Sequence, residues 1–213
     1  MKIIVALFLL VIAGCTTSKE SWISPKNLAP LVREQAFLAQ PDLNPATIFK
    51  VEEYDVKNLW ENLGVQLLLV RYMSAKGEPF NETLMAYHDR KLTPFGHAAG
   101  GHGLMSTVMV GKHLYYTFSW GSGLHRSQIG RLSVDGAGLA INESGGFENV
   151  DLFVRKDGDG IRVEAGRFVG FNSWEPGRTF GWLRTKGSFL AVIDDAGNEI
   201  VSRFDGKRPV GQD

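Results

Sequence analysis

Cysteine is almost absent from this chain, which has one among its 213 residues, Cys15. A single thiol cannot form an intramolecular disulfide, so burial of apolar side chains must hold the folded part together. The chain also has no net excess of positive or negative charge, because its 23 basic and 23 acidic residues cancel. Such a balance provides no basic surface for phosphate, so we expect no nucleic acid partner and no polybasic membrane-binding face.

Long apolar runs are also missing, apart from Ile3 to Ala13 near the N-terminus. This run is too short to cross a bilayer as a stable helix. It matches the apolar core of a signal peptide, and Lys2 provides the positive charge that precedes such a core. The chain has no P-loop and no G-x-G-x-x-G after a strand, so we expect no nucleotide cofactor. It also lacks G-x-S-x-G, which leaves little support for a serine hydrolase.

The apolar run ends in Val11-Ile12-Ala13-Gly14-Cys15, where small residues precede the sole cysteine. With the positive start and the apolar core, this segment resembles the lipobox of bacterial lipoprotein precursors; the resemblance covers Met1 to about Ser18. It implies cleavage before Cys15 and acylation of that cysteine, which would anchor the chain to a membrane. Thr16 stands where an aspartate often signals inner-membrane retention, so the resemblance favours the outer membrane of the bacterial cell envelope.

The rest of the chain predicts one domain. We expect a signal peptide over residues 1–14, a lipidated tether over 15–24, a mainly β domain over 25–206 and a polar tail over 207–213. About 200 residues are enough to bury one sizeable core. Loss of Lys2 with the leader would bring the net charge near −1.

Two short helices are expected at the start of the domain. Leu28 to Ala39 has apolar residues on one face and is stopped by Pro41. The second helix has Asp55 as a suitable N-cap and Gly64 as a suitable end. Its apolar stripe at helical spacing consists of Val56, Leu59, Trp60 and Leu63.

From residue 65 onward the hydrophobic period becomes that of strands. Val65 to Met73 is a mostly apolar run typical of a buried strand. Thr83 to Arg90 fits either a strand or a helix; we favour the strand, because a hairpin with Val65–Met73 gives both runs a partner. Turn signals then recur about every 8 to 12 residues, which is typical of a sandwich or barrel. The later expected strands are Ser127–Val134, Leu139–Asn142, Phe147–Arg155, Ile161–Ala165, Arg167–Phe171, Arg178–Thr185, Phe189–Asp194 and Glu199–Phe204. The predicted fold is therefore mainly β: a single antiparallel β-sandwich or barrel-like domain with two short N-terminal helices.

A central hairpin is expected from Leu104–Val110 and His113–Trp120, joined at Gly111-Lys112. Glycine at the first turn position suits a type II′ turn, which needs φ > 0 there. The resulting register places Val110 opposite His113 and Leu104 opposite Ser119. Because side chains alternate along strands, one face is apolar and is assigned to the core. That face consists of Met105, Thr107, Met109, Leu114, Tyr116, Phe118 and Trp120.

The histidines mark the candidate site, since all five lie between His88 and His125. Glycines beside the open end of the hairpin let backbones approach closely, so three of these histidines could gather there. Exposed aromatics could add a platform for sugar rings or apolar ligands. The tentative ligand-binding residues are His97, His102, Trp120, His125 and Trp174. A metal ion at His97, His102 and His125 is a separate hypothesis, but no HExxH or ligand pair at helical spacing favours it.

Two acidic segments leave alternatives open. Asp157 to Gly160 fits a calcium loop or a hairpin turn, and we favour the turn because the further EF-hand ligands are missing. Glu143, Glu148 and Asp151 are candidate acids for a hydrolase acting on carbohydrate, which needs two carboxylates facing the scissile bond. His113 to Ser122, followed by Ile129-Gly130, is similar to a blade segment of arabinan-degrading propeller glycosidases over about 20 residues, but no catalytic residue of that family can be placed here.

These observations favour a membrane-anchored envelope lipoprotein that binds a ligand or partner without catalysis. The partner class stays open among a small molecule, a carbohydrate and a protein. The alternatives are a hydrolase acting on carbohydrate and a metal-binding β protein.

Overall fold

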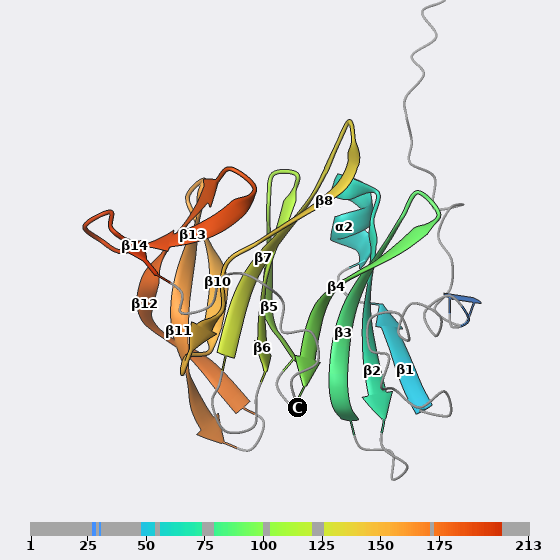
Figure 1. The fold of residues 1–213 in the computed structure, drawn as a ribbon, viewed down its shortest axis with the longest axis horizontal. Coiled ribbons are helices and arrows are strands. Elements are labelled where there is room, and N and C mark those ends of the chain that lie inside the picture. Colours follow the sequence, from blue (N-terminus) through green and yellow to red (C-terminus); the bar gives the residue numbers. More distant parts are fainter. Residues whose placement is uncertain are drawn as a thin grey trace, which may run out of the picture.

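The computed structural model describes residues 27–28, 30, 48–53, 56–73, 79–99, 103–120, 126–170 and 173–201. Most of them belong to antiparallel strands, which confirms the mainly β fold (Figure 1). Helix α2 (Val56–Leu63) forms where the second helix was predicted. Of the other expected helix, only Leu28 and Pro30 lie among the described residues, so the structure confirms one helix and not two. No helix in these ranges is both long and apolar enough to cross a membrane.

The strands form three sheets, in which neighbours along the chain are neighbours in the sheet. The first sheet consists of β1 (Ile48–Glu53), β2 (Gln66–Met73), β3 (Pro79–His88) and β4 (Lys91–Ala99). The central sheet consists of β5 (Gly103–Val110), β6 (His113–Trp120), β7 (Arg126–Asp135) and β8 (Gly138–Glu143), with β9 (Phe147–Glu148) paired to β7. The third sheet consists of β10 (Leu152–Asp157), β11 (Gly160–Gly170), β12 (Ser173–Lys186), β13 (Phe189–Ile193) and β14 (Glu199–Ile200). Each sheet is open, so the described strands do not close into a barrel.

The hairpin β5–β6 has the predicted register from its turn as far as Ser106, which pairs with Thr117. Gly111 has φ 59°, while Lys112 is not among the described residues with positive φ, as a type II′ turn requires. Val110 pairs with His113 as predicted, but Leu104 pairs with Phe118 and not with Ser119. The register shifts between Leu104 and Ser106, as in a β-bulge. Leu104 therefore packs against the apolar cluster in the place predicted for Met105.

The central sheet is covered on both faces, whereas the sequence predicted a single apolar face. Leu114, Tyr116 and Phe118 of β6 join a buried cluster with α2 and with strands β2 to β4 of the first sheet. Tyr115 and Ile129 point the other way and pack in a second cluster with residues of the third sheet. The central sheet consequently lies between the other two, as Figure 1 shows.

Buried hydroxyls attach the third sheet to the central one. The third sheet starts with edge strand β10, whose outer backbone groups have no neighbouring strand to pair with. Leu152 N–H donates to Ser127 Oγ at 3.2 Å, and Val154 N–H donates to Ser106 Oγ at 2.8 Å. Both serines are buried, and Ser106 is bonded in turn to Thr117 at 2.8 Å. Side chains of the central sheet thus accept hydrogen bonds from the edge strand of the third sheet. Without these acceptors, the backbone N–H groups of that edge would be costly to bury.

Several segments differ from the predicted pattern. The strands predicted over Ile161–Ala165 and Arg167–Phe171 are not separate, because one continuous strand, β11, runs from Gly160 to Gly170. Strands β1 and β4 were not predicted; in β4, Pro94 and Gly96 interrupt the strand signal, and a register shift at Phe95 accommodates them. The strand predicted over Phe147–Arg155 is wrong as one element. It is broken by Asn149, which has φ 57°, so that β9 and β10 belong to different sheets.

Tyr116 fills the space above a glycine in the next strand. It pairs with Gly130, and its hydroxyl donates to Glu143 Oε1 at 3.0 Å, one strand further along. Its ring also makes an edge-to-face contact with Phe95 of the first sheet, at 5.2 Å between centroids. A Cβ atom at Gly130 would lie 1.9 Å from Tyr116 Cζ, so only glycine leaves room for the ring.

We predict that Gly130→Ala destabilises the fold by about 1–3 kcal/mol, because the methyl group would displace a tyrosine ring that is packed on all sides. Urea unfolding followed by circular dichroism measures the loss. Gly136→Ala is the matched control: a Cβ there meets no atom within 4 Å. We expect the control to stay within about 0.5 kcal/mol of the parent protein. Equal stability of both variants would contradict the packing described for Tyr116.

Candidate functional site

The residues proposed from the sequence are described only in part. Cys15, His102 and His125 lie outside the described residues. His97 lies in β4, where its backbone pairs with that of Thr83 in β3. Trp174 lies in β12, where its backbone pairs with that of Phe168 in β11. The side chains of His97 and Trp174 are not among those described. Trp120 is half-buried and packs against the cluster between the first and central sheets. The gathering of histidines at the open end of the hairpin therefore stays a prediction.

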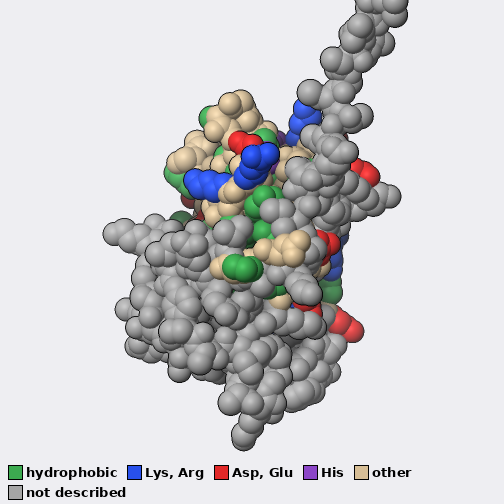
Figure 2. Space-filling view, turned by 90° about the vertical axis from the view of Figure 1, so that its right-hand side faces the viewer, with side chains coloured by type: hydrophobic (Ala, Val, Ile, Leu, Met, Phe, Trp, Pro, Cys, Tyr) green, Lys and Arg blue, Asp and Glu red, His purple; other side chains and the backbone are tan. Residues whose placement is uncertain are grey.

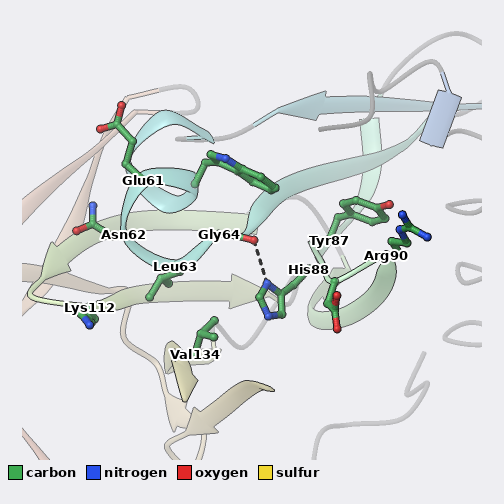
Figure 3. A pocket seen from close by; sticks show the side chains of 11 residues that line it. Glu61, Asn62, Leu63, Gly64, Tyr87, His88, Arg90, Lys112 and Val134 are labelled. Carbon is green, nitrogen blue, oxygen red and sulfur yellow. Dashed lines mark hydrogen bonds between the residues drawn. The ribbon is translucent and has the colours of Figure 1, made fainter. Parts of the chain in front are cut away.

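A different place in the fold forms a cavity of about 550 Å³. It lies where α2 ends and where the turns β3–β4 and β5–β6 come together, with one side closed by β7 (Figure 3). Leu63 and Val134 provide apolar walls, and His88 lies beside them. His88, one of the two histidines that were not among the predicted site residues, is thus the one that lines the cavity.

The imidazole of His88 is held by the end of helix α2. Its Nδ1 atom lies 2.9 Å from the carbonyl oxygen of Gly64, the residue that follows the helix (Figure 3). A carbonyl oxygen can only accept, so Nδ1 carries the proton of this hydrogen bond. The same bond gives a partner to the Gly64 carbonyl, which lies just beyond the last turn of α2. His88 therefore links β3 to α2 and has a fixed ring orientation.

The turn after His88 has an unusual backbone. Asp89 and Arg90 connect β3 to β4 with φ values of 48° and 60°, as a type I′ turn requires. This conformation suits Asn-Gly or Asp-Gly, and for other L-residues it costs about 1–2 kcal/mol each. Both residues line the cavity. A cationic side chain thus occupies a position beside the cavity where glycine would be more stable.

The charges around the cavity have both signs. Arg90 and Lys112 are basic, Glu61 and Asp89 are acidic, and all four are exposed. Figure 3 shows the Glu61 carboxylate turned away from Leu63 and His88. Basic and acidic side chains also adjoin one another at the upper end of the described surface in Figure 2. The rim therefore has no strong excess of either charge.

The acidic candidates lie elsewhere. Glu143 accepts the hydrogen bond from Tyr116, Asp151 is buried, and neither they nor Glu148 line the cavity. Asp157 to Gly160 forms the end of hairpin β10–β11, as predicted. Within the described ranges, no group of three or more His, Cys, Asp or Glu side chains could hold a metal ion.

A second histidine, His113, lies on the face of the central sheet that carries Tyr115, opposite the face that packs against the first sheet. Its ring contacts Tyr115 edge to face, and its Nδ1 atom is buried with no hydrogen-bond partner among the described residues. Burial lowers the pKa of His113 from its usual 6.5, and the nearby Arg131 guanidinium lowers it further. Arg131 itself connects the central and third sheets through Thr185 at 2.9 Å. The neutral imidazole is therefore the form that the fold favours.

The strained turn leads to a prediction about stability. Arg90→Gly should stabilise the fold by about 0.5–1 kcal/mol, because glycine adopts positive φ without steric cost. Lys112→Gly is the matched control, an exposed basic turn residue whose φ is not positive. It should leave stability unchanged or lower it by up to about 1 kcal/mol. Chemical denaturation of both variants measures the difference, and a loss of stability in Arg90→Gly would contradict the strain.

The lowered pKa of His113 predicts a pH dependence. Between pH 6.5 and the lower pKa of the folded state, the unfolded chain binds a proton that the folded chain does not. Stability should therefore fall as the pH is lowered through this window and level off below it. The stability difference between the parent protein and His113→Gln, measured by urea unfolding at a series of pH values, should change only in that window. A constant difference would show that His113 does not titrate differently on folding.

No protein-family model, curated protein or solved structure matches this chain. The interpretation of the cavity therefore depends on its own residues and their contacts.

Proposed function

We propose that this protein is a non-enzymatic lipoprotein of the bacterial cell envelope that binds a small molecule in the cavity beside α2. The observation that carries the proposal is the cavity itself. Its volume of about 550 Å³ lies within the range of roughly 300–1,000 Å³ typical of small-molecule sites. Its lining combines apolar and aromatic side chains with polar and charged ones, so a ligand could make both kinds of contact.

Binding is favoured over catalysis by the residues around the cavity. A nucleophilic mechanism needs a serine, threonine, cysteine or similar group beside its base, and none of the first three is among the described lining residues. A glycosidase needs two carboxylates that face each other across a cleft. Glu143, Glu148 and Asp151 do not line the cavity, and the two acids that do, Glu61 and Asp89, are exposed. His88 is positioned by a backbone carbonyl and not by a carboxylate. The hydrolase hypothesis thus has no support from this site.

The membrane anchor and the finer architecture belong to the same proposal. The segment ending in Cys15 supports a lipid anchor in the outer membrane, with the folded domain carried on a short tether. The apolar clusters on both faces of the central sheet support a layered β-sandwich. A rigid layered body would hold the α2 end and the two turns in place around a ligand.

The binding proposal predicts that fragments occupy the cavity. Mature protein, extracted from membranes in detergent, is screened with a small fragment library while backbone amide shifts are followed by NMR. We expect some fragments to shift the amides of Leu63, His88 and Val134, and Val134→Phe to abolish these shifts by filling the cavity. Val201→Phe is the control, because Val201 is 79% exposed and does not line the cavity. A library that leaves these amides unchanged would remove the binding proposal.

The anchor is tested separately. Mass spectrometry of the native protein should find an N-terminal cysteine that carries acyl chains, and Cys15→Ser should leave the leader uncleaved. An intact leader on the native protein with an unmodified thiol would remove the lipoprotein part of the proposal while leaving the cavity untouched.

A further inference from the structure

We infer that Nε2 of His88 is the polar anchor of the cavity and accepts a hydrogen bond from a hydroxyl or N–H group on a neutral, ring-sized apolar ligand. This inference rests on the proposed binding function and names the class of ligand. It is carried by the hydrogen bond between His88 and Gly64, the apolar walls of the cavity and the balanced charges at its rim.

The tautomer follows from the partner of His88. Because the Gly64 carbonyl can only accept, Nδ1 carries hydrogen, and in a neutral imidazole Nε2 then has a free lone pair. No described residue is bonded to this nitrogen, and Figure 3 shows the far side of the ring directed toward Val134. The acceptor thus faces the cavity in a fixed direction. A ligand that offers a donor there completes the hydrogen bonding of the ring.

The walls determine the rest of the ligand. Leu63 and Val134 lie next to the imidazole and offer only methyl groups to a bound molecule (Figure 3). A ligand with an apolar ring would remove the exposed part of Val134 from water and pack against Leu63, which is already buried in the core. Burial of apolar surface is the main favourable term in such sites. Hydroxyl groups placed against Leu63 and Val134 would instead lose hydration, because these two side chains offer no hydrogen bond.

The rim favours a neutral ligand. The two basic residues there, Arg90 and Lys112, are accompanied by Glu61 and Asp89, and all four are exposed to solvent. The carbonyl groups at the end of α2 add partial negative charge on the side of Gly64. An anion would be attracted by the two basic residues and repelled by the two acidic ones. A cation would be attracted by the acidic residues and repelled by the basic ones.

A purely structural role for His88, as the residue that caps α2, must be distinguished from ligand binding. His88→Asn separates the two roles, because the asparagine amide can replace Nδ1–H as a donor to Gly64 while the acceptor Nε2 is lost. His88→Phe removes both groups. A binding role predicts that the asparagine variant keeps its stability and loses affinity, whereas a capping role predicts that it keeps both.

Three probes test the ligand class: 2-naphthol, which has a ring and a donor; 2-methoxynaphthalene, which has the ring alone; and 2-naphthoate, which is anionic. Affinities are measured by NMR titration of the mature protein at about pH 8. We expect 2-naphthol to bind about tenfold more tightly than its methyl ether, as the loss of one hydrogen bond predicts. His88→Asn should abolish this difference at unchanged unfolding midpoint. Imidazole nitrogen shifts should identify Nδ1 as the protonated nitrogen of the free protein.

Several results would overturn the inference: equal affinity for the naphthol and its ether, tighter binding of the naphthoate, an unchanged preference in His88→Asn, or a protonated Nε2. Failure of all three probes to shift the cavity amides would do so as well. If other fragments still bind in the cavity, only the inference about the ligand class is wrong and the proposed binding function stands. If no fragment binds, the inference and the proposed function are both wrong.

Discussion

The arrangement of the three sheets depends on the burial of both faces of the central sheet. Tyr116 and its neighbours on one face require the first sheet and α2, while Tyr115 and Ile129 on the other face require the third sheet. Removal of either outer sheet would expose apolar side chains whose burial is worth about 1.5–3 kcal/mol each. Ser127 and Ser106 also fix how the third sheet is placed on the central one, because each accepts a hydrogen bond from one particular residue of β10.

The cavity is a consequence of this packing at one end of the layers. Helix α2 is packed by Leu59 and Leu63 into the cluster between the first and central sheets, so its last turn meets the ends of hairpins from both. Turn β3–β4 is anchored to the helix through His88 and Gly64. The side chains that line the cavity thus come from elements whose positions are set by the core, and this restricts how far they can move away from a ligand.

Local patterns were sufficient for several elements. The stripe from Val56 to Leu63 predicted α2, and Gly111 at the first position of its turn predicted the β5–β6 hairpin. Patterns were insufficient where packing overrides them. The chain crosses between sheets at Asn149 inside what reads as one strand, and β4 tolerates Pro94 because the register shifts beside it. The importance of His88 could have been noticed from its place before two polar turn residues, but nothing in the sequence indicates that Gly64 would meet it.

The sequence by itself determined the features that depend on near neighbours: the mainly β class, the helix, the hairpin turns and the N-terminal segment that resembles a lipoprotein leader. Periodicity and turn chemistry act over a few residues, and so these features can be read in order along the chain. Only the tertiary structure decided which faces of the central sheet are buried and which residues meet at the cavity. His88, Lys112 and Val134 belong to different hairpins, and their proximity arises from the packing of separate sheets, which no local pattern encodes.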